Sequence, residues 1–371
     1  MKIEADIAAF LGTTACIIYA QAFSTISSVI PAFSKRGDII VADKAVNYSI
    51  RKGLQISRST VRWYEHNDME DLQRVLAKVT KEQSKKALTR RFIVTEGLFE
   101  NVGDMVDLVK IIELKHRFKF RLILDETWSF GVLGRTGRGV TEHQHVDAAE
   151  VDMIIGSMAG PLCAAGGFCA GSDEIVEHQR LSAASYTFSA ALPAMSATTA
   201  SETLLILQSQ ADLLTGLREN IKAMWAQLDP RSDWMRCMSA VENPIMLMVL
   251  KQEVVNSRRL GADEQQHLLQ EIVDEVSKSK HAARLISFHF FVICLRYGLT
   301  HFIFSSQCLV QGVLITRHKT ILPNPSGTKN EVFSPQPALK ICLTTGLSKK
   351  EVEKAGITIR HAVTKVMTRK R

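Results

Sequence analysis

The sequence predicts an α/β protein, with a mostly parallel sheet covered by helices on both faces and a smaller C-terminal α+β domain. Three observations predict this class. Short apolar runs alternate with amphipathic stretches through the first half of the chain, as in parallel sheets. The stretch from Asp68 to Val79 has apolar residues at the i, i+3, i+4 and i+7 spacing of a core-facing helix. A late apolar run from Ala338 to Thr344 predicts a strand outside this alternation.

The individual elements follow in chain order. A helix is expected over 3–10, and helices over 68–79 and 106–114 separate later strands. Residues 195–227 predict one long helix that leads out of the large domain. Ser348, with Glu351 three residues later, predicts a capping box that starts a last helix. The strands are expected at residues 16–19, 38–42, 61–64, 91–94, 120–124, 153–156 and 167–170.

The length of 371 residues is sufficient for two hydrophobic cores. We expect a large domain over 1–195, a connecting helix over 196–227 and a small C-terminal domain over 228–371. An atypical apolar segment, 285–316, lies within the small domain.

Composition narrows the classes of partner. The net charge is +8, which attracts anionic membranes or nucleic acid, although a solvated basic tail is the simpler interpretation. No nucleic-acid motif is present, so no nucleic acid is expected as a partner. The seven cysteines form no C-x-x-C pair and no Cys/His cluster, which indicates a reduced protein without a metal site. The chain begins inside a predicted helix without a cap and without a signal peptide, so we expect an N-terminal truncation.

The functional residues of a parallel sheet lie just beyond the carboxyl ends of its strands. Here those positions are Asn47 and Ser49, Glu96 and Gly97, Asp125 to Trp128, and Ser157 to Gly160. They are the first candidates for a site.

Three segments carry a resemblance to a known family: 125–139, with its repeated glycines, 164–168 and 186–193. Together they resemble the α-oxoamine synthases, pyridoxal-phosphate (PLP) enzymes that join an amino acid to an acyl-CoA with loss of carbon dioxide. The resemblance implies the PLP-transferase fold type I. Within this family, 30–39, 130–134 and 139–143 look most like the non-catalytic first (long-chain-base) subunits of serine palmitoyltransferase. The resemblance covers roughly residues 3–284 and 337–365.

The resemblance implies a site that has lost its chemistry. A PLP enzyme needs a lysine for its Schiff base and an acid at the ring nitrogen. The family's lysine position falls on Gly160, and 152–171 contains no lysine. Two family histidines fall on Asn47 and Trp128, and the substrate arginine falls on Ala338. Asp125 keeps the ring-nitrogen position, as a vestige or as a simple turn-capping carboxylate.

The resemblance also implies an assembly. The chain is expected to form a heterodimer with the catalytic subunit of serine palmitoyltransferase, which would hold the PLP, and small regulatory subunits are possible further partners. Ser189, and less strongly Thr187, would reach the phosphate of the partner's PLP. The alternative is that these hydroxyls bond to their own backbone. The complex would support condensation of L-serine with palmitoyl-CoA to 3-ketosphinganine at the cytosolic face of the endoplasmic reticulum membrane. Membrane attachment would come through the complex or through a missing N-terminal helix.

Two other functional hypotheses stay open. A self-sufficient PLP-dependent acyltransferase would need a lysine from elsewhere, and Lys319, Lys329 and Lys340 are the candidates. A misfolded product of a faulty gene model is the other hypothesis, and segment 285–316 motivates it. A membrane span there would contain Arg296 and His301 at a cost, and buried strands are a second interpretation. A translated intron is preferred, because the family pattern resumes on its far side.

Overall fold

The computed structural model describes residues 2–85, 87–277, 314–317, 333 and 335–369. The chain divides into two compact units. The first unit comprises 1–101, 105–211 and 322–333, and the second comprises 102–104, 212–321 and 334–371. Each unit is described by itself.

The first unit is built on a seven-stranded mixed sheet with the order β1-β7-β6-β5-β4-β2-β3. Strands β3, β2, β4, β5 and β6 are parallel, while β7 runs antiparallel to β6 and β1. The central strands are buried on both faces, as their continuous apolar runs predict. The strands are β1 (Ala15–Tyr19), β2 (Ile39–Asp43), β3 (Thr60–Tyr64), β4 (Arg91–Glu96), β5 (Arg121–Asp125), β6 (Met153–Ser157) and β7 (Gly167–Gly171).

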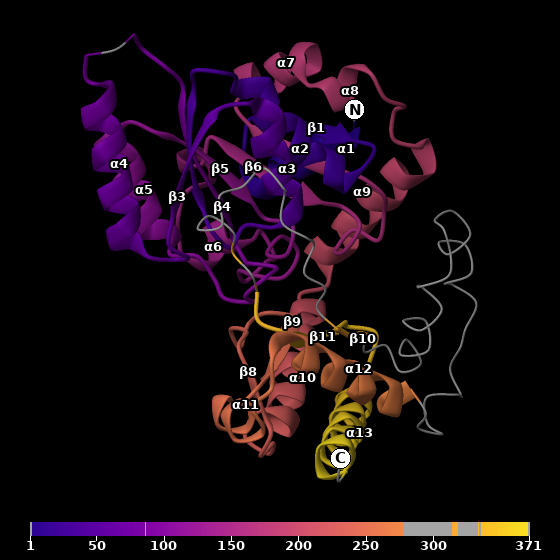
Figure 1. Cartoon of the computed structure of the whole chain (residues 1–371). Helices are drawn as coiled ribbons and strands as arrows, with labels where there is room; N and C mark the ends of the chain where they lie inside the picture. The colour runs from indigo at the N-terminus through magenta and orange to yellow at the C-terminus, as the bar shows by residue number, and fades with distance from the viewer. Residues whose placement is uncertain (1, 86, 278–313, 318–332, 334, 370–371) are drawn as a thin grey trace. The chain divides into compact units, whose positions relative to one another are not determined.

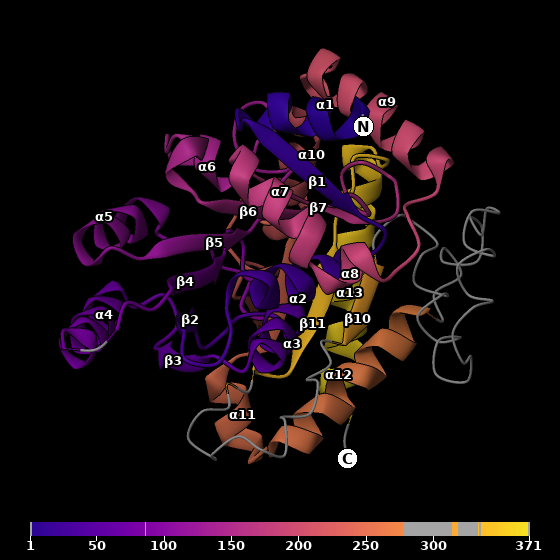
Figure 2. The ribbon, with the colours of Figure 1, turned by 90° about the horizontal axis from the view of Figure 1, so that it is seen from above.

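Helices cover both faces of this sheet. Figure 2 shows α4 and α5 on one side of the sheet and α2 and α3 on the other. The helices of this unit are α1 (Lys2–Leu11), α2 (Ala22–Phe33), α3 (Tyr48–Ser57), α4 (Met69–Gln83), α5 (Leu108–Phe118), α6 (Val140–His143), the 3-10 helix η1 (Ala148–Glu150), α7 (Asp173–Ser182), α8 (Ala184–Thr187) and α9 (Ala194–Ser209). The predicted α/β architecture is therefore confirmed, and each predicted strand of the sheet lies within one or two residues of the observed one.

The second unit contains an antiparallel sheet with the order β10-β11-β9-β8. Helices α10 and α12 pack against α13, and the predicted capping box of Ser348 and Glu351 starts α13. The elements are α10 (Asp212–Leu228), β8 (Met235–Cys237), β9 (Ile245–Leu250), α11 (Gln252–Arg258), α12 (Ala262–Ser277), β10 (Leu314–Arg317), β11 (Ala338–Cys342) and α13 (Lys349–Thr368) (Figure 1). Because both an antiparallel sheet and helices are present, this unit has the expected α+β composition.

Two differences from the sequence-based expectations concern the second half of the chain. The expected single helix over 195–227 is wrong: α9 ends at Ser209 and α10 begins at Asp212. No glycine or proline lies between the two helices to mark this break. Most of the atypical segment 285–316 lies outside the described residues. Its last residues, 314–316, form part of β10, which pairs with β11.

Candidate functional site

Three polar side chains meet at the carboxyl ends of β4 and β5 in the first unit. Glu96 and Asp125 are the last residues of these parallel strands and stand opposite each other in the register. Asn47, the N-cap residue of α3, is placed between them by the turn that follows β2. All three are buried, with exposed fractions of 1%, 2% and 4%. The carboxyl edge of the sheet therefore carries a closed polar cluster, which we call the Asn47 cluster.

The hydrogen bonds of Asn47 hold this cluster together. Its backbone N–H donates to Glu96 Oε1 at 2.6 Å, and its side-chain Nδ2 donates to Asp125 Oδ2 at 2.9 Å. Its Oδ1 accepts from the backbone N–H of Ile50 at 3.0 Å, which caps α3. Because the cap fixes the oxygen, the amide nitrogen is the end that faces Asp125. One asparagine thus satisfies a helix end and two buried carboxyl groups.

Burial raises the pKa values of the acids at this edge. It raises the pKa of Asp125, although hydrogen bonds from Thr127 and Asn47 oppose the shift. The pKa of Glu96 lies well above its usual value because of burial and then the charges of Asp125 and Glu100. Burial also raises the pKa of Glu126 to about 7, against hydrogen bonds from Ser129 and the backbone of Val140. Burial therefore shifts each of these acids toward its neutral form.

Asp125 also accepts a hydrogen bond from the backbone N–H of Thr127, two residues later, at 2.9 Å. A carboxylate that accepts from the backbone two residues later caps a turn, which is one of the two roles expected for Asp125. Trp128, the second replaced histidine position, lies half-buried in the turn that follows β5. The structure thus brings Asn47 and Asp125 together.

The loop between β6 and β7 contains Gly160, on which the resemblance places the family's lysine. Gly160 is exposed in this loop, and a Cβ atom added there would meet no atom within 4 Å. By contrast, Gly166 has φ +92°, and an added Cβ would lie 2.4 Å from the carbonyl oxygen of Tyr19. The Gly166 position therefore depends on glycine for packing and backbone conformation, whereas Gly160 has room for a larger side chain.

The segment with Thr187 and Ser189 lies at the end of α8 and just beyond it. Ser189 is exposed, and its Oγ donates to the carbonyl oxygen of Ser185 at 2.5 Å. The Oγ1 of Thr187 donates to the carbonyl oxygen of Ala183 at 3.2 Å. Both hydroxyls therefore bond to their own backbone in this chain, as the alternative interpretation expects. Between them, the side chain of Phe188 is 85% exposed.

An ion-pair network fixes this segment to the rest of the unit. Arg180 on α7 pairs with the buried Glu4 of α1 at 3.2 Å, and its Nη1 donates to the hydroxyl of Tyr186 at 2.9 Å. The backbone N–H of Ser185 donates to Ser28 Oγ at 3.0 Å. The exposed Phe188 and Ser189 therefore stand on a rigid support.

Sequence reasoning missed two parts of this region. The sequence analysis identifies Glu96 as a strand-end residue but does not predict its contact with Asn47 or its position beside Asp125. The parallel pairing of β4 with β5 is the signal for that position. The second is a dyad in which His66 Nδ1 lies 3.0 Å from Oδ1 of the buried Asp43, beside the ring of Phe99. Their positions after β3 and at the end of β2 are the signal that could have found it.

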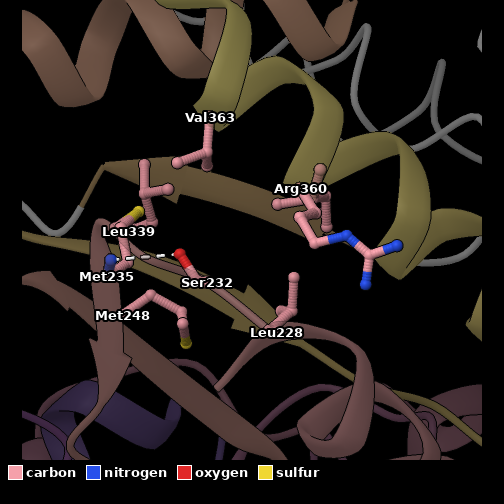
Figure 3. Close-up of a pocket in the computed structure, with 8 residues that line it drawn as sticks. Leu228, Ser232, Met235, Met248, Leu339, Arg360 and Val363 are labelled. Carbon is pink, nitrogen blue, oxygen red and sulfur yellow. Dashed lines mark hydrogen bonds between the residues drawn. The ribbon is translucent and has the colours of Figure 1, made fainter. Parts of the chain in front are cut away.

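The second unit contains a cavity of about 10 Å³ between the sheet and the helices, shown in Figure 3. A space of this size holds about one water molecule. Ser232 Oγ lies at its wall and accepts from the backbone N–H of Met235 at 3.1 Å. Its other lining residues are Leu228, Met235, Met248, Leu339, Ile359, Arg360 and Val363. The cavity is a packing feature and is too small for a substrate.

Among the described residues, no group of three or more His, Cys, Asp or Glu side chains could hold a metal ion. Among the helices that the structure describes, none is both long enough and apolar enough to cross a membrane.

The mixed sheet, its flanking helices and the strand-end cluster define the class of protein. The model of the family "Aminotransferase class I and II" matches residues 2–296, and the chain belongs to this family. The chain is similar to serine palmitoyltransferase 1 of Dictyostelium discoideum, with 34% identity over 96% of this chain and 66% of that protein. It is also similar to long chain base biosynthesis protein 1 of Arabidopsis thaliana, with 41% identity over 67% of this chain and 51% of that protein.

The chain therefore spans between about half and two thirds of the length of these curated relatives. Among solved structures, it is similar to a serine palmitoyltransferase from S. paucimobilis with a bound PLP–myriocin aldimine. The TM-score is 0.75 at 20% identity, and the match covers 100% of this chain and 77% of that one. At this identity the likeness shows the fold, which is the PLP-transferase fold type I that the sequence predicts.

The residues described here do not fit a covalently bound PLP. The loop that carries Gly160 offers no amine, because residues 152–171 contain no lysine. The carboxylate of Asp125, which the resemblance assigns to the ring nitrogen, accepts from Asn47 Nδ2 and Thr127 N. Glu96 likewise accepts from the backbone N–H groups of Asn47 and Glu100, so both acids have donors within the protein.

Proposed function

We propose that this chain is a non-catalytic subunit of serine palmitoyltransferase, which forms a heterodimer with a catalytic subunit that holds the PLP. The complex would condense L-serine with palmitoyl-CoA to 3-ketosphinganine, the first step of sphingolipid long-chain base synthesis. The observation that carries the proposal is the combination of Gly160 with the closed Asn47 cluster. A family site without an amine cannot form a Schiff base with the cofactor.

In this proposal the chain acts by completing the partner's site. The support is the exposed segment at Phe188 and Ser189, which Arg180 and Tyr186 hold in place. A hydroxyl on a rigid support loses little conformational freedom when it binds a phosphate, so it contributes more to affinity than a flexible one. Ser189 would exchange its bond to the Ser185 carbonyl for one to the phosphate of the partner's PLP. Thr187 is the second candidate for this contact.

The location follows from the same proposal. A subunit of this complex would act at the cytosolic face of the endoplasmic reticulum membrane, with small regulatory subunits as further partners. Its attachment would come through the complex or through a preceding helix.

Co-expression with a catalytic serine palmitoyltransferase subunit tests the proposal. We expect the two chains to co-purify and to form 3-ketosphinganine, whereas this chain alone forms none. An aspartate at an exposed apolar interface position is costly to desolvate, so Phe188→Asp should abolish co-purification. Val109→Asp is the matched control, because Val109 is also exposed, at 55%, and lies on α5. Product from this chain alone, or loss of the complex with both variants alike, contradicts the proposal.

A second variant separates the phosphate contact from assembly. Ser189→Ala removes one hydroxyl donor, and the loss of a hydrogen bond to a charged group corresponds to about a ten- to hundredfold weaker PLP affinity of the complex. Titration of the purified pair with PLP measures this affinity, and co-purification should stay unchanged. Ser182→Ala, at an exposed serine of α7, is the control. Unchanged PLP affinity in Ser189→Ala would mean that the Ser189 hydroxyl bonds only to its own backbone and does not contact the phosphate.

A further inference from the structure

Five exposed cations lie in loops that precede strands β2, β3 and β4. Lys35 and Arg36 lie between α2 and β2, and Arg58 lies between α3 and β3. Lys85 and Arg90 lie between α4 and β4, whose turn is at the upper left of Figure 1. Because the three strands are parallel neighbours, these loops all lie at the amino-terminal ends of the strands, opposite to the Asn47 cluster at the carboxyl ends. We call these five residues the basic edge.

Direct contacts hold the three loops together. Ser59 Oγ donates to the carbonyl oxygen of Lys35 at 3.1 Å, which joins the loop before β3 to the loop before β2. The backbone N–H of Arg90 donates to Asp38 Oδ1 at 3.0 Å, which joins the loop before β4 to the loop before β2. The cations of the basic edge therefore stand on one connected surface.

Acidic side chains offset only a small part of this positive charge. Asp38, which is 6% exposed and accepts from the backbone N–H groups of Lys35 and Arg90, contributes one negative charge beside the five cations. Glu82, near the end of α4, pairs with Arg62 at 3.6 Å. Within the part of the chain that the structure describes, no member of the basic edge forms an ion pair. The edge therefore keeps its positive field.

Two large apolar side chains stand among these cations. Leu88 is 95% exposed between Lys85 and Arg90, and Ile56 is 57% exposed at the end of α3, two residues before Arg58. Cations are favoured at helix C-termini, which accounts for Arg58 but not for an exposed leucine. Apolar side chains flanked by lysine and arginine suit the boundary between lipid headgroups and acyl chains. A surface for single-stranded nucleic acid would instead present aromatic side chains for stacking, and the five residues of the basic edge include none.

We propose that the basic edge is a docking surface for a membrane that contains anionic lipids. The five cations would contact headgroup phosphates and carboxylates, while Leu88 and Ile56 enter the interfacial layer. The +8 net charge of the chain acts in the same direction at longer range. This surface is independent of the proposed enzyme complex, because it needs neither PLP nor a partner subunit.

Vesicle co-sedimentation of the full chain tests the proposal. The probes are vesicles of phosphatidylcholine alone and of phosphatidylcholine with about 30% phosphatidylserine, a fraction chosen for an appreciable negative surface potential. We expect binding only to the anionic vesicles, and weaker binding as salt is raised from about 0.05 to 0.5 M, because salt screens the surface charge. The triple variant Lys35→Gln, Arg36→Gln and Arg58→Asn should bind at least about tenfold more weakly. Asparagine is chosen at residue 58 because its φ is +55°.

Controls keep the test specific to this edge. Lys349→Gln, Lys350→Gln and Lys354→Gln remove the same number of exposed charges from α13 and should weaken vesicle binding much less than the triple variant does. Leu88→Ser, at a side chain that is 95% exposed, should weaken binding by about threefold or more without a change in the far-UV circular dichroism spectrum. Equal binding by the triple variant and the wild type would overturn the proposal. So would binding to a single-stranded oligonucleotide that the triple variant loses, with no binding to anionic vesicles.

Discussion

Asn47 makes hydrogen bonds to two buried acids at the carboxyl end of the sheet. Its side-chain Nδ2 donates a hydrogen bond to Asp125, and its backbone N–H donates one to Glu96. Both carboxyl groups are buried, and a buried acceptor without a donor is costly. The sequence identified Asn47 and Asp125 as strand-end residues, but their contact depends on the N-cap conformation of Asn47. A side-chain rotamer at a helix end is not encoded in the spacing of residues along the chain.

The change Asn47→Asp isolates this contact. Aspartate keeps the cap on Ile50 but removes the donor to Asp125 and adds an acid beside two buried carboxyl groups. We expect the free energy of unfolding at pH 7 to fall by about 2–4 kcal/mol, measured by urea denaturation. The control is the reverse exchange at the exposed N-cap of α4, Asp68→Asn. This variant should change the free energy of unfolding by less than about 0.5 kcal/mol. A similar small effect in both variants would show that the Asn47 amide does not hold Asp125.

Glu126 predicts how stability depends on pH. Its pKa rises from 4.5 to about 7 on folding, so the folded state binds a proton that the unfolded state has released. The free energy of unfolding should therefore decrease as the pH rises from about 4.5 to 7, by at most about 3 kcal/mol from this group. Glu96 and Asp125, whose pKa values are also raised, act in the same direction.

Urea denaturation at pH 5, 6, 7 and 8 measures this dependence. Glu126→Gln cannot titrate, so its curve should be flatter than that of the wild type over this range. It also loses an acceptor for Val140 or Ser129, which lowers stability at every pH without changing the slope. Parallel curves for the two proteins would mean that Glu126 does not take up a proton on folding.

At the scale of elements, the packing of α13 on α10 depends on Gly356. An added Cβ at this position would lie 2.7 Å from the Cβ of Gln227. Gly356→Ala should therefore lower the free energy of unfolding by about 1–3 kcal/mol, even though alanine is favoured in helices. The matched control is Gly216→Ala on α10, where an added Cβ meets nothing within 4 Å. The free energy of unfolding of that variant should rise by about 0.5–1 kcal/mol. A rise in both variants would contradict the close contact at Gly356.

The sheet of the first unit was predictable because its strands are buried on both faces. Such strands are continuous apolar runs, and β2, β5 and β6 each match one. The glycines at 131, 134, 137 and 139 all have positive φ, a backbone conformation that glycine adopts without strain. The break between α9 and α10 was missed because a helix can end without glycine or proline when its tertiary contacts end.

At the scale of the whole molecule, the family and the proposed role depend on different observations. The fold and the family match place the chain among the class I and II aminotransferases. The proposed loss of catalysis depends on a few positions, Gly160, Asn47 and Trp128, which the fold does not determine. The resemblance to the family implies these positions, and the structure adds the hydrogen bonds of Asn47 to Glu96 and Asp125. The basic edge was visible in the sequence only as net charge, because its residues come from three separate loops.

The most direct test of the account is whether the isolated chain retains PLP on a lysine. The purified chain is incubated with PLP, reduced with borohydride and dialysed, and its absorbance and modified peptides are recorded. We predict no stoichiometric modification, whereas Gly160→Lys supplies a control that shows whether the loop admits an amine. Stoichiometric labelling of one lysine in the unmodified chain, together with product formation, would contradict the claim that this chain is not a catalyst by itself.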